Sequence, residues 1–567
     1  MSGRIVNRRV RLLVAAFAFA FALVLVRASW VQGVRAGSLE ALAVNQHRET
    51  IAVPGHRGSI FDRTGVELAL GERATSVYAN PRQIANPRPV AIAVAQVLGE
   101  KPSRILALLA NRSRGFVYVA RKADPRKAAE LARRRITGLG FLPEERRVYP
   151  LRGVGSEVVG YAGTDNVGLA GLELAYDDTL GGRDGRKTIV RDPAGHALAV
   201  VDSHDARDGR DVHLTLDNTL QRDVERVLAE TRRRWSARAA TAVVLDPRTG
   251  SILAMAVEPG FDGNRFPAAP REVQRNRAVT DTYEPGSTFK VVTLAAVLEE
   301  GMVEPWTTYT LPYELEVADR KIHDAEPRGT ETMSVAEILS HSSNVGVVTL
   351  ALGLGRERLA RWVDRFGFGH RTGIEYPGET PGIVVPPDRW SGSTIGNVPI
   401  GQGIAVTPLQ MAAAYGAVAN GGEWIRPHLV ERIEGERAAP VARRRIISAK
   451  TARQLRGMLR GVVEEGSGTE AQVPGYYVAG KTGTAAKPDP VHGGYSDTRY
   501  VASFVGFAPA RHPRLVVLVT VDEPRGTIWG GTVAAPAFRE IAQFALQYLQ
   551  VPPDVPAEAA AAAPVAP

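Results

Sequence analysis

The 567-residue chain contains no cysteine. It therefore has no disulfide framework, no thiolate zinc site and no cysteine nucleophile. Charge of one sign is never concentrated either, because runs of like charge stop at three residues, as in Arg133–Arg135. This excludes the basic arm of a nucleic-acid-binding protein, so we expect no nucleic acid partner, and the net charge of +10 reflects arginines spread over the chain. With 44% hydrophobic residues, the sequence can fill the cores of two or three domains.

Long hydrophobic runs are scarce, and the one that decides the class of protein lies near the N-terminus. Uncharged apolar residues extend from Leu12 to Val26. The run reaches the roughly 20 residues that cross a bilayer if Arg27 points to the interface and the segment continues to Val31. We therefore predict a transmembrane anchor at residues 12–31. The alternative is a cleaved signal peptide, which the arginine beside the candidate cleavage site disfavours.

Four arginines precede the anchor, at positions 4, 8, 9 and 11. Positively charged residues stay on the cytoplasmic side of a membrane. We therefore expect residues 1–11 to be cytoplasmic, the anchor to cross the cell membrane once, and everything after it to lie outside the cytoplasm.

Behind the anchor, the sequence divides near residue 210. Residues 32–210 mix short β-like runs, glycine-rich turns and Arg/Ala-rich helices, and we interpret them as an elongated, mixed α/β pedestal. Residues 211–550 begin and end with apolar strands and carry helices between them, which predicts an α+β domain whose sheet is assembled from distant parts of the chain. The Pro/Ala-rich tail, 551–567, is predicted to be disordered. The expected strands are 241–245, 251–256, 477–479, 503–507 and 515–521, and a final helix covers about 536–549.

The first motif with chemical potential is Ser287-Thr288-Phe289-Lys290. Pro285 and Gly286 break the preceding structure, and an apolar stretch then runs to Gly301, which predicts a buried helix. Ser287 would lie in its first turn and Lys290 one turn later on the same face, with Cβ atoms about 5–6 Å apart. Burial and the positive helix end would lower the pKa of the lysine enough for it to act as the base that a serine nucleophile needs. Alone, the pattern also fits an N-cap serine beside an exposed lysine.

The second motif, Ser342-Ser343-Asn344, lies in a corner between two expected helices. Ser334 and Glu337 form a capping box for a short helix that ends near Ser340, and another helix begins near Val345. A hydroxyl in this corner can relay a proton, and an amide can orient a lysine or bind a peptide carbonyl. Alone, the motif also fits an ordinary helix cap.

The third motif is Lys481-Thr482-Gly483-Thr484, which follows the strand expected at 477–479. Small residues on an edge strand let a peptide backbone pair alongside as an added strand. The lysine and the threonine hydroxyls can hold a carboxylate. Residues 475–482 also satisfy the Gly-x4-Gly-Lys-Thr phosphate-loop pattern, but no buried strand precedes them and no long helix can follow, so we reject that interpretation.

In this order, Ser-x-x-Lys, Ser-x-Asn and Lys-Thr-Gly-Thr resemble the penicillin-binding-protein and serine β-lactamase superfamily. The resemblance implies a penicillin-binding/serine-β-lactamase-like transpeptidase domain, with an antiparallel sheet flanked by helices. Upstream, His56–Gly65 and Gly168–Glu173 resemble the family's N-terminal pedestal, or dimerisation-type, domain. Four flanking stretches resemble class B, monofunctional penicillin-binding proteins: Tyr283–Lys290, Ser342–Gly346, Ile400–Met411 and Ala502–Pro509. The compact pedestal suggests the division type within this class.

Position by position, the resemblance implies a peptidoglycan D,D-transpeptidase that works without cofactor or metal. Ser287 would attack the penultimate D-Ala carbonyl of a stem peptide, and Lys290 would take its proton. Ser342 would relay a proton, and Asn344 would support Lys290 and the substrate. Backbone N–H groups of Ser287 and Thr484 would form the oxyanion hole. The substrate carboxylate would be bound by the strand Lys481, Thr482, Gly483 and Thr484.

The resemblance also implies what resolves the acyl-enzyme. The amine of a neighbouring stem peptide would form a crosslink during septal cell-wall synthesis, and β-lactams would acylate Ser287. Between Asn344 and Lys481 there is no Glu-x-x-Asn, the pattern with which class A β-lactamases activate water. No Glu-Asp-x-x-Phe type glycosyltransferase motif occurs, so we expect a separate membrane glycan polymerase and division proteins as partners. The open alternatives are a D,D-carboxypeptidase, an elongation-type or sporulation-type transpeptidase, and a non-catalytic penicillin-binding sensor or scaffold.

Overall fold

The computed structural model describes residues 3–34, 48–191, 197–437, 439–489 and 491–555. Its contacts form two units, Met1–His56 with Gly182–Gly209, and Arg57–Gly181 with Arg210–Pro567. The part of the predicted disordered tail beyond residue 555 lies outside the described residues. Before that point, Val551 is buried and Asp554 Oδ1 accepts the Tyr477 N–H at 2.8 Å, so the chain is packed on its unit up to Asp554.

The first unit begins with a long helix, α1 (Gly3–Ser29), that continues into a π-helical turn, η1 (Trp30–Val34). Residues Asn7–Gly33 are long and apolar enough to cross a membrane, and they include the anchor predicted at 12–31. The helix is therefore a candidate membrane anchor. The unit also holds a three-stranded antiparallel sheet of β1 (Arg48–Val53), β8 (Gly185–Arg191) and β9 (Ala197–His204), with β8 in the centre.

The second unit contains a six-stranded sheet of order β18-β10-β2-β3-β4, in which β5 pairs with β3. Three helices pack on β3 and β4 through an apolar cluster that includes Val94, Ile105 and Leu131. Asp62 makes the turn between β2 and β3, because its Oδ1 accepts the N–H groups of Thr64 and Val66 at 2.8 Å. These elements are β2 (Ile60–Phe61), β3 (Glu67–Ala79), α3 (Pro87–Leu98), α4 (Pro102–Ala110), β4 (Val117–Ala123), α5 (Pro125–Arg133), β5 (Leu139–Val148), β10 (Val212–Leu214) and β18 (Val430–Ile433).

The two stretches that resemble the family's N-terminal domain, His56–Gly65 and Gly168–Glu173, meet in a buried ion cluster. Arg57 Nε lies 2.7 Å from Glu173 Oε2, and Arg147 Nε lies 2.6 Å from Glu173 Oε1. All three side chains are buried. Removing one partner from a buried pair leaves an uncompensated charge, which costs about 3–5 kcal/mol. The cluster therefore locks His56–Gly65 to Gly168–Glu173.

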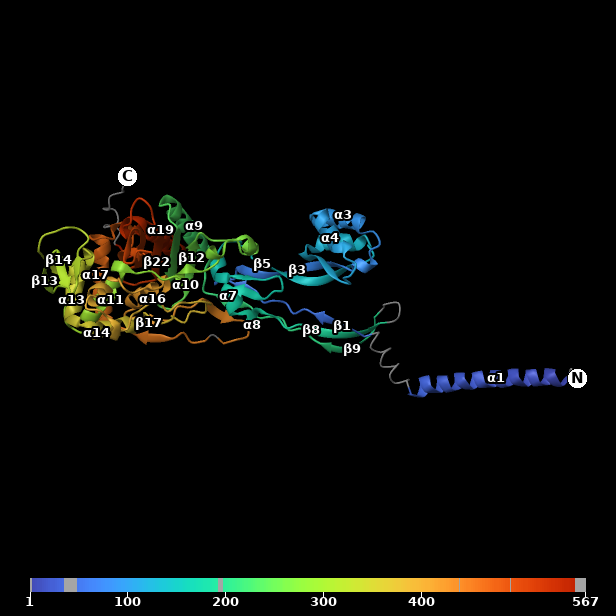
Figure 1. Ribbon diagram of the computed structural model, residues 1–567. Coiled ribbons are helices and arrows are strands. Elements are labelled where there is room, and N and C mark those ends of the chain that lie inside the picture. The colour runs from blue at the N-terminus through green and yellow to red at the C-terminus, as the bar shows by residue number, and fades with distance from the viewer. Residues whose placement is uncertain (1–2, 35–47, 192–196, 438, 490, 556–567) are drawn as a thin grey trace. The chain divides into compact units, whose positions relative to one another are not determined.

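The centre of the second unit is a five-stranded antiparallel sheet of order β12-β11-β22-β21-β20 (Figure 1). Its side chains alternate between two apolar clusters: Val244 and Val517 pack with α9 and α19, whereas Val243 and Leu518 pack with α11, α16 and α17. The sheet thus lies between two helical layers, which confirms the predicted α+β fold. The elements are α9 (Asn218–Arg234), β11 (Ala239–Leu245), β12 (Ile252–Glu258), α11 (Lys290–Glu299), α16 (Pro408–Ala419), α17 (Ala449–Glu464), β20 (Ala479–Pro488), β21 (Tyr495–Ala508), β22 (Leu515–Asp522) and α19 (Ala535–Tyr548).

The strand expected at 477–479 is wrong, because β20 begins only at Ala479 and itself contains Lys481–Thr484. Tyr477 lies outside the strand, with the Arg460 guanidinium 3.8 Å from its ring centre. Pairing with β21 defines the strand instead, since Lys481 lies opposite Val505. The third motif consequently forms part of the outermost strand of the sheet.

Shorter elements complete the second unit and carry the loops around the sheet. They include α6 (Ser156–Val159), α7 (Gly171–Ala175), α8 (Asp177–Leu180), α10 (Arg277–Thr280), β13 (Thr308–Leu311), β14 (Glu314–Val317), β15 (Arg320–His323), β16 (Glu331–Ser334), α14 (Arg356–Arg365), α15 (Thr394–Asn397), β17 (Glu423–Ile425), β19 (Arg443–Arg445) and α18 (Gly530–Val533).

Candidate active site

Ser287 lies in a short 3₁₀ turn, η5 (Gly286–Phe289), that runs directly into α11. The predicted helix is therefore wrong in its first turn and correct beyond it, where α11 is buried and ends before Gly301. The turn packs closely on β20, because a Cβ on Gly286 would lie 3.0 Å from Thr484 O. Gly286 also has a φ of +55°, in the left-handed region. Side chains three residues apart eclipse in a 3₁₀ turn, so Ser287 and Lys290 still share a face.

Ser342 and Asn344 occupy the corner between α12 (Val335–Ser340) and α13 (Asn344–Leu354), and the predicted capping box starts α12. Ser343 caps α13, because its Oγ accepts the Gly346 N–H at 2.9 Å. Ser342 has a φ of +58°, in the left-handed region that costs a residue with a side chain about 1–2 kcal/mol. This strained backbone turns Ser342 into the cleft that also receives Ser287.

Asp324, which lies outside the three motifs, holds this corner through its carboxylate. Asp324 Oδ1 accepts the N–H groups of Asn344 at 2.6 Å and Val345 at 3.0 Å, and the Ser343 hydroxyl donates to it at 3.1 Å. Negative charge at the N-terminus of α13 is favourable, and Arg328 neutralises it through an ion pair of 2.6 Å. Asp324 thus holds the second motif in place.

Lys290 connects the nucleophile turn to the corner. Its Nζ lies 2.5 Å from Ser342 O, 3.1 Å from Ser342 Oγ and 2.8 Å from Asn344 Oδ1. Burial lowers the pKa of Lys290 well below its usual value, and the positive charge of Lys481 lowers it further, against the opposing charge of Asp324. A neutral amine donates two hydrogen bonds, here to Ser342 O and Asn344 Oδ1, and keeps a lone pair that can accept a proton from a hydroxyl.

The edge strand brings a second buried lysine to the site. Burial lowers the pKa of Lys481 to about 7. Its Nζ contacts Thr482 Oγ1 at 3.1 Å and Ser467 Oγ at 3.2 Å, and Thr482 and Ser467 contact each other at 2.9 Å. Thr484 Oγ1 accepts the Gly530 N–H at 3.1 Å. The hydroxyls and the ammonium therefore gather at one end of the strand.

Gly483 explains how the nucleophile turn reaches the edge strand. A Cβ at this position would lie 2.9 Å from both Pro285 O and Thr288 Cγ2, and 2.4 Å from Ser503 Oγ. Any side chain would therefore push the strand away from the turn that carries Ser287. Glycine is required here by close approach of backbone.

All three motifs line one cleft of about 770 Å³. Ser287, Ser342, Asn344, Thr482 and Thr484 are in its wall. Lys290, Lys481 and Gly483 are buried behind that wall. The predicted site residues are thus brought together without exception, with hydroxyls at the surface and amines beneath them.

Two groups on the wall were missed from the sequence. Ser467 precedes η8 (Thr469–Ala471) and completes the hydroxyl set around Lys481, and Gln402 enters the cleft from the loop after η7 (Val398–Ile400). Asp324 and Ser467 are 20 and 14 residues from the motifs they support. No local pattern marks such partners, although the pair Asp324 and Arg328, four apart, is a weak signal.

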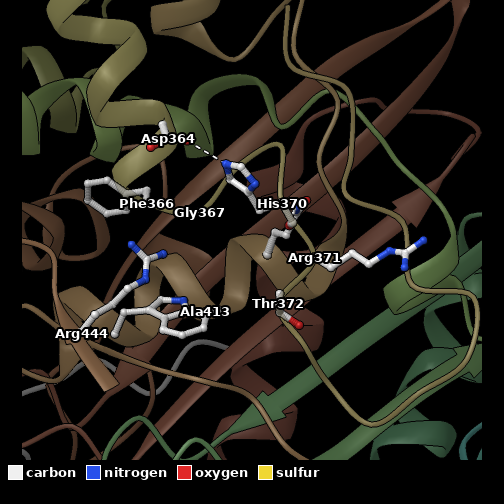
Figure 2. Close-up of a pocket in the computed structure, with 10 residues that line it drawn as sticks. Asp364, Phe366, Gly367, His370, Arg371, Thr372, Ala413 and Arg444 are labelled. Atoms are coloured by element: carbon white, nitrogen blue, oxygen red, sulfur yellow. Dashed lines mark hydrogen bonds and ion pairs between the residues drawn. The ribbon is translucent and has the colours of Figure 1, made fainter. Parts of the chain in front are cut away.

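A separate pocket lies between α14, α16 and β19 (Figure 2). It has a volume of about 320 Å³, and Asp364 and His370, which both line it, contact each other at 2.7 Å. Arg444 lies over the Trp424 ring at 4.7 Å and donates to Arg365 O, so it caps the end of α14. None of the predicted site residues lines this pocket.

Comparison with known proteins places the chain in a family. The family described as Penicillin binding protein transpeptidase domain matches residues 240–543, and the Penicillin-binding Protein dimerisation domain matches residues 52–214. Stage V sporulation protein D of Bacillus subtilis is 36% identical over 543 residues, covering 93% of this chain and 83% of that protein. The probable peptidoglycan D,D-transpeptidase PenA of Neisseria gonorrhoeae is 34% identical over 568 residues, covering 98% and 95%.

Solved structures agree with these matches. Penicillin binding protein 3 of Mycobacterium tuberculosis, complexed with aztreonam, has a TM-score of 0.72 at 32% identity and covers 89% of this chain and 99% of that chain. The fold and the three-motif cleft thus define a serine enzyme of the penicillin-recognising type. The chain belongs to the class B penicillin-binding proteins, which are peptidoglycan D,D-transpeptidases, as the sequence motifs predicted.

Proposed function

We propose that the chain crosslinks peptidoglycan stem peptides through an acyl-enzyme on Ser287, during septal cell-wall synthesis. The main support for the proposal is that all three motifs line one cleft, in which Lys290 Nζ is hydrogen-bonded to both Ser342 and Asn344. The names of relatives such as PenA support the reaction. The name of stage V sporulation protein D keeps a sporulation role as the alternative setting.

In the proposed acylation, Ser287 Oγ bonds to the carbonyl carbon of the penultimate D-Ala, and its proton passes to neutral Lys290. Ser342 Oγ, 3.1 Å from Lys290 Nζ, gives its proton to the nitrogen of the terminal D-Ala as the C–N bond breaks, and it takes the proton held by Lys290 in return, so Lys290 is neutral again in the acyl-enzyme. Backbone N–H groups of Ser287 and Thr484 stabilise the oxyanion, a contribution of about 2.7–4 kcal/mol for each donor.

The carboxylate of the terminal D-Ala binds at the edge strand in this proposal. Lys481 supplies the positive charge, and the Thr482 and Thr484 hydroxyls supply hydrogen bonds. The contacts of 3.1 Å between Lys481 Nζ and Thr482 Oγ1, and the backbone approach allowed by Gly483, support this arrangement. The peptide would pair with β20 as an added strand.

Deacylation by an amine completes the crosslink. The amine nitrogen of a second stem peptide attacks the ester carbonyl, and its proton returns through Lys290 to Ser287 Oγ as the C–O bond breaks. The absence of Glu-x-x-Asn between Asn344 and Lys481 favours an amine over an activated water as acceptor. It argues against fast hydrolysis of the acyl-enzyme of the class A β-lactamase kind.

We also infer the topology. The arginines at positions 4, 8, 9 and 11 keep the N-terminus in the cytoplasm, α1 crosses the membrane once, and the catalytic domain faces the outside. A membrane glycan polymerase and division proteins would then be the partners, because the chain has no glycosyltransferase motif of its own.

Labelling of the full chain with a fluorescent penicillin, followed by peptide mapping, tests the nucleophile. The adduct is expected on the peptide that contains Ser287, and an adduct on any other residue would contradict the assignment. Incubation with a stem pentapeptide and an amine acceptor tests the reaction. Crosslinked dimer is expected, whereas monomer shortened by one D-Ala without dimer would establish a carboxypeptidase instead.

A further inference from the structure

A second set of contacts holds the turn that carries Ser287. Tyr283 and Val406 exchange backbone hydrogen bonds of 3.0 and 2.9 Å, and the Gly286 N–H donates to Gly401 O at 3.1 Å. The loop Gly401–Gly403, which we call the glycine loop, packs closely on the turn, because a Cβ on Gly401 would lie 2.2 Å from Gly286 O. Its middle residue, Gln402, lines the catalytic cleft.

Glu284 fastens the glycine loop to the hairpin of β20 and β21. Its Oε1 accepts the Gly403 N–H at 3.1 Å and the Tyr495 hydroxyl at 3.0 Å. Tyr495 is the first residue of β21 and lies opposite Pro488, at the outer end of β20. One carboxylate oxygen thus joins segments that are 119 and 211 residues away in sequence.

The other carboxylate oxygen of Glu284 destabilises the fold. Oε2 is buried and has no hydrogen-bond partner among the described residues. Burial raises the pKa of Glu284. A buried polar atom without a partner lowers the stability of the fold, so stability alone does not account for glutamate at this position. Local rules are broken mainly at sites that serve function.

The course of the edge strand relates this tie to the substrate. Under the proposed function, on which this inference rests, the terminal carboxylate lies at Lys481–Thr484 and the reacting carbonyl lies at Ser287. The upstream residues of the donor stem peptide then continue along β20 beyond Thr484, toward Pro488 and Tyr495, at about 3.3 Å per residue. The Tyr495 side chain is 44% exposed there and can contact a ligand.

We propose that Glu284 is a positioning residue that holds Tyr495 and Gln402 as a binding wall for the upstream residues of the donor stem peptide. The Tyr495 ring offers an apolar surface, and the Gln402 amide offers a donor and an acceptor for peptide backbone. Glu284 itself acts through the two hydrogen bonds of its Oε1.

Two thioester substrates test the proposal on the full chain. One carries only an N-acylated D-Ala, and the other carries the complete stem peptide before the same thioester. Glu284→Ala is expected to lower kcat/KM for the long thioester about tenfold, mainly through KM, and to change the short one by no more than about twofold. Tyr495→Phe, which removes one hydroxyl at a half-exposed site, is expected to show the same preference with a smaller effect.

Conservative and matched variants separate positioning from general destabilisation. Glu284→Gln keeps an oxygen that accepts from Gly403 and Tyr495, so it is expected to restore most of the long-substrate efficiency. Glu300→Ala is the matched control, because Glu300 accepts the Trp362 indole N–H at 2.9 Å and pairs with Arg358 at 3.0 Å, away from the cleft. It is expected to affect the two thioesters equally.

Three results would overturn the proposal: equal losses on both thioesters in Glu284→Ala, a loss in Glu284→Gln as large as in Glu284→Ala, or a normal KM for the long thioester in Tyr495→Phe. Wild-type protein that processes neither thioester, and that takes no penicillin on Ser287, would instead overturn the proposed function and this inference with it.

Discussion

Replacing Ser342 by glycine or by alanine separates the strain of the second motif from its chemistry. Both changes remove the hydroxyl that lies 3.1 Å from Lys290 Nζ. Only glycine relieves the φ of +58°, because it has no Cβ to disfavour the left-handed region. The two variants should therefore be equally slow in acylation and unequal in stability.

The size of the difference follows from the structure. Loss of the hydroxyl contact costs about 0.5–1.5 kcal/mol in either variant. Glycine recovers the strain of about 1–2 kcal/mol and loses about 0.5–1 kcal/mol through the greater freedom of its unfolded chain. Ser342→Gly should thus exceed Ser342→Ala in stability by about 1 kcal/mol, which is about 1 °C in melting temperature for a unit of this size, at about 2.1 cal/mol/K per residue.

Thermal unfolding of the detergent-solubilised chain, followed by tryptophan fluorescence, measures the stability of both variants. Fluorescent-penicillin labelling measures acylation, which we expect to fall about 10²–10⁴-fold in each, because a positioned proton relay contributes that much. An alanine variant that melts at or above the glycine variant would refute the strain argument. Acylation at the wild-type rate in either variant would refute the relay.

Lys290→Ala should abolish penicillin labelling while circular dichroism stays unchanged, and normal labelling would remove Lys290 from the role of base. Acylation by a carboxylate-bearing β-lactam should fall as the pH rises above about 7, because Lys481 has a pKa of about 7 and its neutral amine no longer pairs with the carboxylate. An analogue with that carboxylate amidated should show no such fall. Identical pH profiles for the two compounds would contradict the role of Lys481 in binding the carboxylate. Asp324→Asn should lower stability by about 3–5 kcal/mol, because Arg328 is left without its ion-pair partner, while the remaining side-chain oxygen can still accept the Asn344 N–H. The exposed pair of Glu314 with Lys321, 2.8 Å apart, is the control, and Glu314→Gln should cost less than about 1 kcal/mol by denaturant unfolding.

Sequence reasoning located the site because its three motifs are local patterns with fixed chemistry. The spacing of Ser287 and Lys290 places them on one face in an α-helix and in a 3₁₀ turn alike, so the error in the type of turn did not change the prediction. The nearly continuous apolar runs at 241–245 and 515–521 identified central strands, because such strands are buried on both faces of the sheet. The family resemblance then supplied the roles of the individual residues.

What the sequence did not reveal depends on contacts between distant segments. Tyr477 has a high strand propensity, yet it lies in a loop, and Gly480 and Gly483 lie in the strand because β21 pairs with them. Asp324 and Glu284 are ordinary acidic residues until the fold places backbone N–H groups against them. Neither the spacing of residues along the chain nor the composition predicts such partners.

The order of the strands also determines when the enzyme can begin to act. Ser287 is synthesised halfway along the chain, but β11 has β22 as its neighbour, and among the described strands β20 is attached to the sheet only through β21. A growing polypeptide that stops before Leu515 therefore has its nucleophile but no completed edge to receive a ligand. Pairings between such remote segments form late in folding. We therefore expect an unfinished copy to be inert toward penicillin, with reactivity appearing only once almost the entire chain has been made.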